Sequence, residues 1–183
     1  MPRQVILFDP PERFVVGTVG QPGERTFFLQ ARSGSKLVAV ALEKTQVSVL
    51  ADRLEELLDA LAARTSGIPG AEDVTSSDIA PLDAPIVEEF RVGALGLGWN
   101  GETKRLIIEA HAITEDEHEI PDLEQGDDSD PDVLRVRLTA AAGRAFISRA
   151  RTVVAAGRPP CPFCQQPLDP SGHICPRANG YHR

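Results

Sequence analysis

Twice along this chain, a group of short strand-like segments is followed by one amphipathic helical segment. From residue 45 to 64, apolar residues recur at three- and four-residue steps, which is the period of one helix face. The runs before it are apolar and β-branched and are separated by turn-forming residues, as is typical of strands: 4–8, 14–19, 25–32 and 36–42. This succession predicts an α+β protein in which strands precede a helix.

The second half of the chain follows the same order. The Asn100-Gly101 dipeptide favours a hairpin turn between two of its strands. The predicted strands and the final helix are 90–96, 104–111, 133–138 and 140–156. We interpret this as an internal duplication, with two curved antiparallel sheets packed with two helices about a pseudo-twofold axis. The architecture resembles the PUR-repeat and whirly class, which is built from repeated units of four strands and a helix.

The predicted domain organisation follows from this repeat. Each repeat alone would leave its helix stripe and one sheet face exposed, so we expect the two repeats to fold as one unit. The segment that joins them is rich in Gly, Pro, Ser and Asp and is interpreted as a linker. The expected organisation is a duplicated domain over 1–157 (repeat one 1–64, linker 65–85, repeat two 86–157) and a zinc-knuckle tail over 158–183.

Charge is segregated along the sequence. The net charge is −8, yet residues 115–132 hold ten acidic side chains and no Lys or Arg, and residues 133–183 hold eight Arg and one acid. We interpret 115–132 as a solvated acidic loop. One hypothesis is that this loop folds over an arginine-rich face and masks it. The arginines of that face are candidates for binding polyanions such as nucleic acid: Arg135, Arg137, Arg144, Arg149 and Arg151.

All three cysteines of the chain lie in one short tail, CPFCQQPLDPSGHICPRANGYHR. Cys161 and Cys164 have the Cys-x-x-C spacing of a zinc knuckle, and Cys175 supplies a third thiolate. The fourth ligand is His173 or His182; His173 is preferred because a Ser-Gly pair before it lets the chain turn back. Four protein ligands predict a closed, structural Zn²⁺ site. The tail has too few large apolar residues for a core, so the metal would supply its folding free energy.

Other interpretations of the cysteines and of the remaining motifs are weaker. A redox role for the Cys-x-x-C pair is disfavoured because the motif follows two prolines instead of a strand. Three clustered cysteines also argue against a disulfide framework. The glycine-rich stretch 92–101 is interpreted as a hairpin and not as a phosphate-binding loop. His111 and His118 have no evident partner, and the sequence contains no recognisable catalytic motif.

Several motifs together resemble a known family. They are the CPFC and GHICPRANGY elements of the tail, the opening FDPPERFVVGTVG and the strand FFLQAR. These elements are similar to an uncharacterised, conserved-hypothetical family of actinobacteria, a domain of unknown function with a CPxC…GHxCPRxNGY zinc-binding tail. The resemblance covers most of the chain and implies no particular activity.

The expected function is that of a non-catalytic zinc-binding interaction module for protein or nucleic acid. No small-molecule substrate is identified. No apolar run reaches the ~20 residues of a membrane helix, and the first residues lack the h-region of a secretory signal. With its clustered thiols, the protein is therefore expected in the cytoplasm, away from membranes. The alternative is an enzyme whose site lies between the two repeats, with zinc purely structural.

Overall fold

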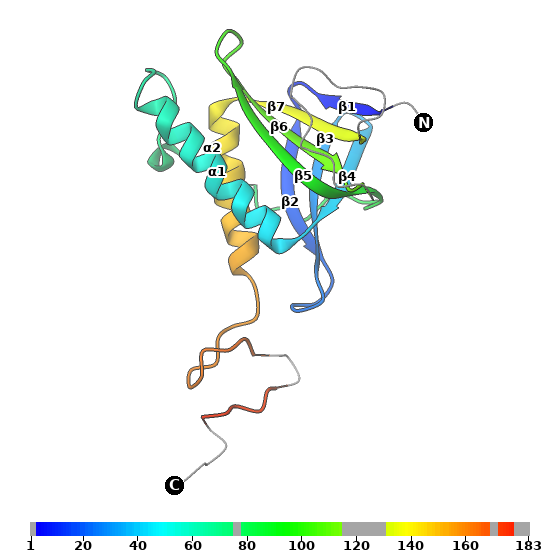
Figure 1. Cartoon of the computed structure of the whole chain (residues 1–183), viewed down its shortest axis with the longest axis vertical. Helices are drawn as coiled ribbons and strands as arrows, with labels where there is room; N and C mark the ends of the chain where they lie inside the picture. Colours follow the sequence, from blue (N-terminus) through cyan, green and yellow to red (C-terminus); the bar gives the residue numbers. More distant parts are fainter. Residues whose placement is uncertain (1–2, 75–77, 115–130, 169–171, 178–183) are drawn as a thin grey trace.

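The computed structural model describes residues 3–74, 78–114, 131–168 and 172–177. Within these residues, two helices pack on one face of a seven-stranded sheet. The C-terminal tail leaves the end of the second helix and extends away from the sheet (Figure 1). The α+β class predicted from the sequence is therefore confirmed.

The first half of the chain forms four strands and one helix. The apolar alternation over residues 13–42 places one side chain in two toward the helices, as a half-covered sheet requires. Glu43 begins the helix: its side chain and that of Gln46 form a reciprocal capping box, with the Glu43 N–H donating to Gln46 Oε1 at 2.8 Å. The elements are β1 (Val5–Phe8), β2 (Arg13–Val19), β3 (Thr26–Ser33), β4 (Lys36–Leu42) and α1 (Lys44–Ala62).

The second half forms three strands and one helix. The predicted turn at Asn100-Gly101 is present, and the Asn100 side chain accepts hydrogen bonds from the backbone N–H groups of Glu102 and Thr103. Thr139 caps the final helix by accepting from the Ala142 N–H. The elements are the short 3-10 helix η1 (Ala71–Asp73), then β5 (Glu88–Asn100), β6 (Arg105–Ala112), β7 (Val133–Leu138) and α2 (Ala140–Ala155).

All strands join one sheet, in the order β1-β7-β6-β5-β4-β3-β2. The β1–β7 and β4–β5 pairs are parallel and the others are antiparallel. The expected pair of separate antiparallel sheets is therefore wrong, and the pseudo-twofold axis is not confirmed. The physical reason is the crossover through α1, which returns the chain so that β5 can run alongside β4 in the same direction.

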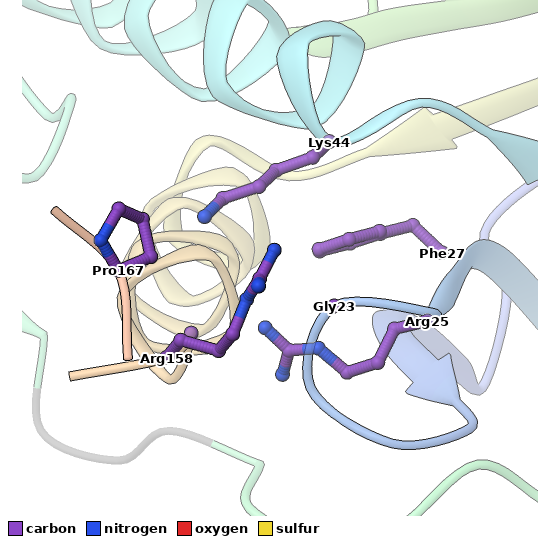
Figure 2. Close-up of a pocket in the computed structure, with 7 residues that line it drawn as sticks. Gly23, Arg25, Phe27, Lys44, Arg158 and Pro167 are labelled. Carbon is purple, nitrogen blue, oxygen red and sulfur yellow. The ribbon is translucent and has the colours of Figure 1, made fainter. Parts of the chain in front are cut away.

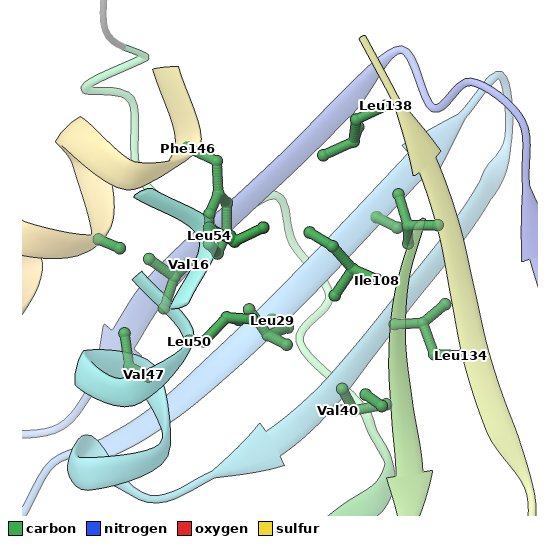
Figure 3. Close-up of a cluster of buried hydrophobic side chains, with 14 of the residues drawn as sticks. Val16, Leu29, Val40, Val47, Leu50, Leu54, Ile108, Leu134, Leu138 and Phe146 are labelled. Carbon is green, nitrogen blue, oxygen red and sulfur yellow. The ribbon is translucent and has the colours of Figure 1, made fainter. Parts of the chain in front are cut away.

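The core lies between the sheet and the two helices. The apolar stripe of α1 faces the strands, and the apolar face of α2 packs beside it against β2 (Figure 3). Gly143 lets α2 approach the sheet closely, because a Cβ at this position would stand 2.8 Å from Leu106 Cδ2. The fully or nearly fully buried helix residues are Val47, Leu50, Ala51, Leu54, Leu58, Phe146, Ile147 and Ala150.

The opposite face of β3 and β4 is covered by the last residues of the predicted linker. Leu82 packs on the small cluster formed by Phe28, Ala39 and Ala41, whose side chains alternate with those of the main core. Gln30 is 1% exposed and exchanges two hydrogen bonds with the Asp83 backbone, at 2.9 and 2.8 Å. The segment 78–83 is therefore an ordered part of the fold and contributes to burial on this face.

Arg149 of α2 holds this segment in place. Its guanidinium is buried and donates to the carbonyl oxygens of Val16 (2.7 Å) and Ala80 (2.8 Å). It also contacts both the backbone and the side chain of Asp78, which in turn pairs with Arg13 at 2.6 Å. One side chain thus joins α2, β2 and the segment 78–83.

Replacing Arg149 by methionine is expected to lower the free energy of unfolding by about 2–3 kcal/mol, because buried carbonyl groups lose their donor. Urea unfolding of the full chain measures this difference. The control is Arg53→Met on the exposed side of α1, where an ion pair with Glu56 is open to solvent and a change below about 0.5 kcal/mol is expected. Equal losses in the two variants would contradict the structural role of Arg149.

Candidate metal centre

The first half of the tail folds into a tight turn around two cysteines. The Cys161 N–H donates to the Gln166 carbonyl at 2.8 Å, and the Gln165 N–H donates back to the Cys161 carbonyl at 2.9 Å. Gln165 has φ +62°, a left-handed conformation that reverses the chain after Cys164. An isolated β-bridge between Pro160 and Pro167 closes the base of the turn. These bonds direct both cysteine side chains to the same side.

The second half of the tail brings two further side chains to that side. Cys175 Sγ lies 3.8 Å from Cys161 Sγ, and His173 Nε2 lies 3.3 Å from Cys164 Sγ. The four candidate ligand atoms all lie within 4.8 Å of one another. The structure therefore brings together the four residues that the sequence predicts as metal ligands.

The spacing of these atoms suits a shared metal ion. Zinc–sulfur bonds of about 2.3 Å at tetrahedral angles place two sulfur atoms about 3.8 Å apart, which agrees with the Cys161–Cys175 distance. A disulfide would need a sulfur–sulfur distance of about 2.05 Å, and all three cysteines are free thiols. The donor set of three sulfurs and one imidazole nitrogen fits a zinc-type ion, although distance alone does not identify the metal.

The electrostatics of the turn already favour one thiolate. Burial works to raise the pKa of Cys161, but N–H groups of Cys164 and Phe163 donate to it and lower its pKa. For Cys164, a backbone hydrogen bond at Gln166 works to lower the pKa, but burial and the neighbouring sulfurs outweigh it, so its pKa is raised. Grouped thiolates repel one another, and a bound cation would relieve this repulsion.

His173 reaches the cluster through one ring nitrogen. Its Nε2 faces the Cys164 sulfur, which makes Nε2 the candidate ligand atom, whereas its Nδ1 is buried without a hydrogen-bond partner. The competing candidate, His182, lies outside the described residues. His173 is therefore placed at the site by an observed contact, and the choice between the two histidines stays a prediction until both are changed.

The arginines predicted to bind polyanions are placed differently from expectation. Arg144 and Arg149 are buried, so these two cannot belong to an exposed face. The acidic residues 115–130 lie outside the described part of the chain, and so does their proposed masking role. The polyanion-binding role of the arginines stays a prediction. Each pairs with an acid of this chain: Arg135 with Glu109, Arg137 with Asp9, Arg144 with Asp59, Arg149 with Asp78, and Arg151 with Glu55 and Asp52.

A buried polar cluster on β6 and β7 escaped the sequence analysis. His111 Nε2 lies 3.0 Å from Glu109 Oε2, and Arg135 Nε donates to Glu109 Oε1. Glu109 and His111 are each 1% exposed. Burial works to raise the pKa of Glu109, but contacts with His111 and Arg135 outweigh it and lower this pKa. The available signal was the two-residue spacing on one strand face, with Arg135 opposite Glu109 in the register.

A pocket of about 550 Å³ lies near the junction of the two halves, where the alternative enzyme site was expected. The β3–β4 hairpin and residues 83–89, which lead into β5, line it. Two of its charged groups, Arg32 Nε and Asp83 Oδ2, pair with each other at 3.1 Å. This pairing stabilises the fold at that point, and a catalytic role for the pocket stays a prediction.

A mixed sheet with two helices and a C-terminal Cys/His cluster together define an α+β protein with a candidate metal centre. The family model for the protein of unknown function DUF3090 matches residues 6–175, and the chain belongs to this family. The match includes all four candidate ligands, which confirms the resemblance to an uncharacterised family. Neither a curated protein nor a solved structure matches the chain. In the described residues, no helix is long and apolar enough to cross a membrane.

Proposed function

We propose that this protein is a non-catalytic zinc-binding interaction module whose ion folds the tail into a contact surface. The convergence of four ligand atoms within 4.8 Å carries this proposal. Thiolate and imidazole ligands suit Zn²⁺. Four protein ligands fill a tetrahedral shell and leave no position for a catalytic water, so the ion acts as a structural element. Thiolate ligands also require a reducing compartment, which places the protein in the cytoplasm.

The surface beside the ion favours a protein partner. Phe163 and Ile174 lie next to metal ligands in the chain and are 61% and 83% exposed. The Arg177 guanidinium donates to the Phe163 carbonyl at 3.3 Å, so the two segments that carry these apolar side chains are joined. Exposed aromatic and aliphatic side chains on a rigid support act as anchors in protein–protein contacts. The described nucleic-acid alternative depends on exposed arginines, of which the paired set above offers fewer.

The two halves of the domain also support an origin by duplication. β2-β3-β4-α1 and β5-β6-β7-α2 have the same order, with three strands in antiparallel sequence followed by a helix. In this proposal the parallel β4–β5 pair joins two related units side by side. The zinc tail is an addition after the second unit.

Affinity purification from the native host tests the proposed interaction. The bait is the zinc-loaded full chain, and the matched variant carries Phe163→Ser and Ile174→Ser, which changes no metal ligand. We expect one stoichiometric protein to copurify with the wild type, to be lost with the variant, and to be unaffected by nuclease.

Zinc content separates the two parts of the proposal. The variant should keep its zinc, so loss of the partner reports on the apolar surface alone. Equal recovery of the partner by the variant, or recovery that depends on nucleic acid, would overturn the proposed protein surface. Absence of zinc from the wild type would overturn the metal centre itself.

A further inference from the structure

Three positively charged side chains meet in a pocket between the domain and the tail. Arg25 comes from the start of β3, Lys44 is the first residue of α1, and Arg158 follows α2. Figure 2 shows the ends of these side chains pointing toward one space, with the Phe27 ring and Pro167 at its sides. The pocket has a volume of about 280 Å³. No carboxylate lines it in the part of the chain that the structure describes.

Two glycines leave room for the charged groups. A Cβ on Gly157 would stand 3.3 Å from Lys44 Nζ and 3.7 Å from an Arg25 guanidinium nitrogen. A Cβ on Gly23 would stand 3.1 Å from the guanidinium carbon of Arg158. The charged ends of all three side chains therefore lie where larger residues at 23 and 157 would intrude. Arg25 is also held over the Phe27 ring, 5.5 Å from its centroid, by a cation–π contact.

This arrangement is unfavourable without an anion. Like charges at short range repel one another, and in the described residues neither Arg25 nor Lys44 forms an ion pair. Lys44 also stands at the positive end of the α1 dipole, where an acidic residue would be the stabilising choice. The nearest acid in sequence, Glu43, pairs with Arg91 at 3.0 Å. The fold thus directs positive charge into the pocket from three separate segments.

We propose that this pocket binds the diphosphate group of a phosphorylated small molecule. Two guanidinium groups offer paired donors that match phosphate oxygens, and the Lys44 ammonium adds a point charge. A single phosphate monoester carries a charge of about −1.5 to −2 at neutral pH, which leaves three cations incompletely balanced. Two linked phosphoryl groups balance them better, and a pocket of about 280 Å³ has room for both.

The tail forms one wall of this site. Pro167 lines the pocket and belongs to the turn that carries Cys161 and Cys164. A diphosphate in the pocket would therefore contact β3, α1, the end of α2 and the base of the tail together. This site is independent of the proposed protein partner, because Phe163 and Ile174 are not among its lining residues.

Isothermal titration of the zinc-loaded full chain with pyrophosphate tests the proposal. We expect binding that weakens as salt rises, and weaker binding of inorganic phosphate. Arg25→Gln and Lys44→Gln should each weaken pyrophosphate binding about 10–100-fold, the usual loss for a charge-assisted hydrogen bond. Arg53→Gln, on the exposed side of α1, removes the same charge away from the pocket and should bind as the wild type does.

Gly157→Ala keeps every charge but places a methyl group beside Lys44, so it should also weaken binding. Zinc content and thermal unfolding of each variant verify that the fold is intact. The proposal is overturned by absent pyrophosphate binding, by unchanged affinity in the Arg25 and Lys44 variants, or by equal affinity for inorganic phosphate. Binding of short single-stranded RNA without any binding of pyrophosphate would likewise overturn it in favour of a nucleic-acid site.

Discussion

Cys175→Ser is expected to weaken zinc binding about 10²–10³-fold and to unfold the tail. Structural zinc sites of this type contribute about 10–16 kcal/mol in total, so one of four ligands accounts for roughly 2.5–4 kcal/mol. The tail has little else to hold it, because Phe163 and Ile174 are exposed instead of forming a core. Zinc analysis of the purified protein and amide hydrogen exchange over 161–177 measure the two effects.

The domain should tolerate this loss. Its core lies between the sheet and the two helices, and no residue of the tail belongs to the main core cluster. We therefore expect exchange protection in β3 and β6 to stay as in the wild type. Ile174→Ser is the matched control, because it changes an exposed neighbour of Cys175 and no ligand. Full zinc content in Cys175→Ser would refute the assigned site.

The two histidines can be separated in the same experiment. His173→Ala should lose zinc affinity to a similar extent as Cys175→Ser, since His173 Nε2 lies among the sulfur atoms. His182→Ala should keep it. The reverse result would make His182 the fourth ligand.

Glu109→Gln is expected to lower the free energy of unfolding by about 3–5 kcal/mol. Its carboxylate is 1% exposed and contacts both His111 and Arg135. Removing one partner of a buried charged group leaves the other incompletely balanced, and losses of this size are typical. Urea unfolding measures the change. Glu102→Gln, in the exposed turn after β5, removes the same charge at the surface and should change stability by less than about 0.5 kcal/mol.

The pH dependence of stability gives this prediction a second readout. The folded protein holds the pKa of Glu109 below its ordinary value of 4.5. The carboxylate therefore stabilises the native state above about pH 4.5, and this contribution is lost as pH falls through the lower pKa of the folded state. The stability difference between wild type and Glu109→Gln should accordingly shrink below pH 4.5. A difference that stays constant to lower pH would contradict this assignment.

A double-mutant cycle separates the ion pair from other effects of the substitution. Arg135→Met alone leaves Glu109 with His111 as its charged partner, whereas the double variant removes both charges of the pair. We expect the double variant to be less destabilised than the sum of the single variants, with a coupling of about 1–3 kcal/mol. Strict additivity would show that Glu109 and Arg135 act independently.

Local pattern was sufficient for the elements of this fold but not for their arrangement. The stripe from Val47 to Leu58 and the alternation in β3 depend on neighbours a few residues away, so the sequence indicates them directly. The pairing of β4 with β5 depends on where the crossover through α1 returns the chain. That return is set by packing of the whole helix on the sheet, which short-range periodicity does not report.

The metal ligands were predictable for the same reason that the arginines were not. The Cys-x-x-C spacing and the nearby His173 and Cys175 bring ligands together within one short segment. The partner of Arg144 is Asp59 on the other helix, and that of Arg149 is Asp78 in the linker. Their charges are therefore used across long sequence separations. The pocket of Arg25, Lys44 and Arg158 was missed likewise, since three distant segments supply it.

The contact between Arg149 and Val16 also bears on aggregation. β2 is the last strand of the sheet, and its outer backbone groups are a template on which a strand of another molecule can pair. The guanidinium of Arg149 occupies the Val16 carbonyl, and the segment 78–83 is held across the neighbouring strands. A chain without this contact would expose a partly unpaired strand rich in Val and Phe. The segment that joins the two halves thus also protects the protein from forming intermolecular β-structure.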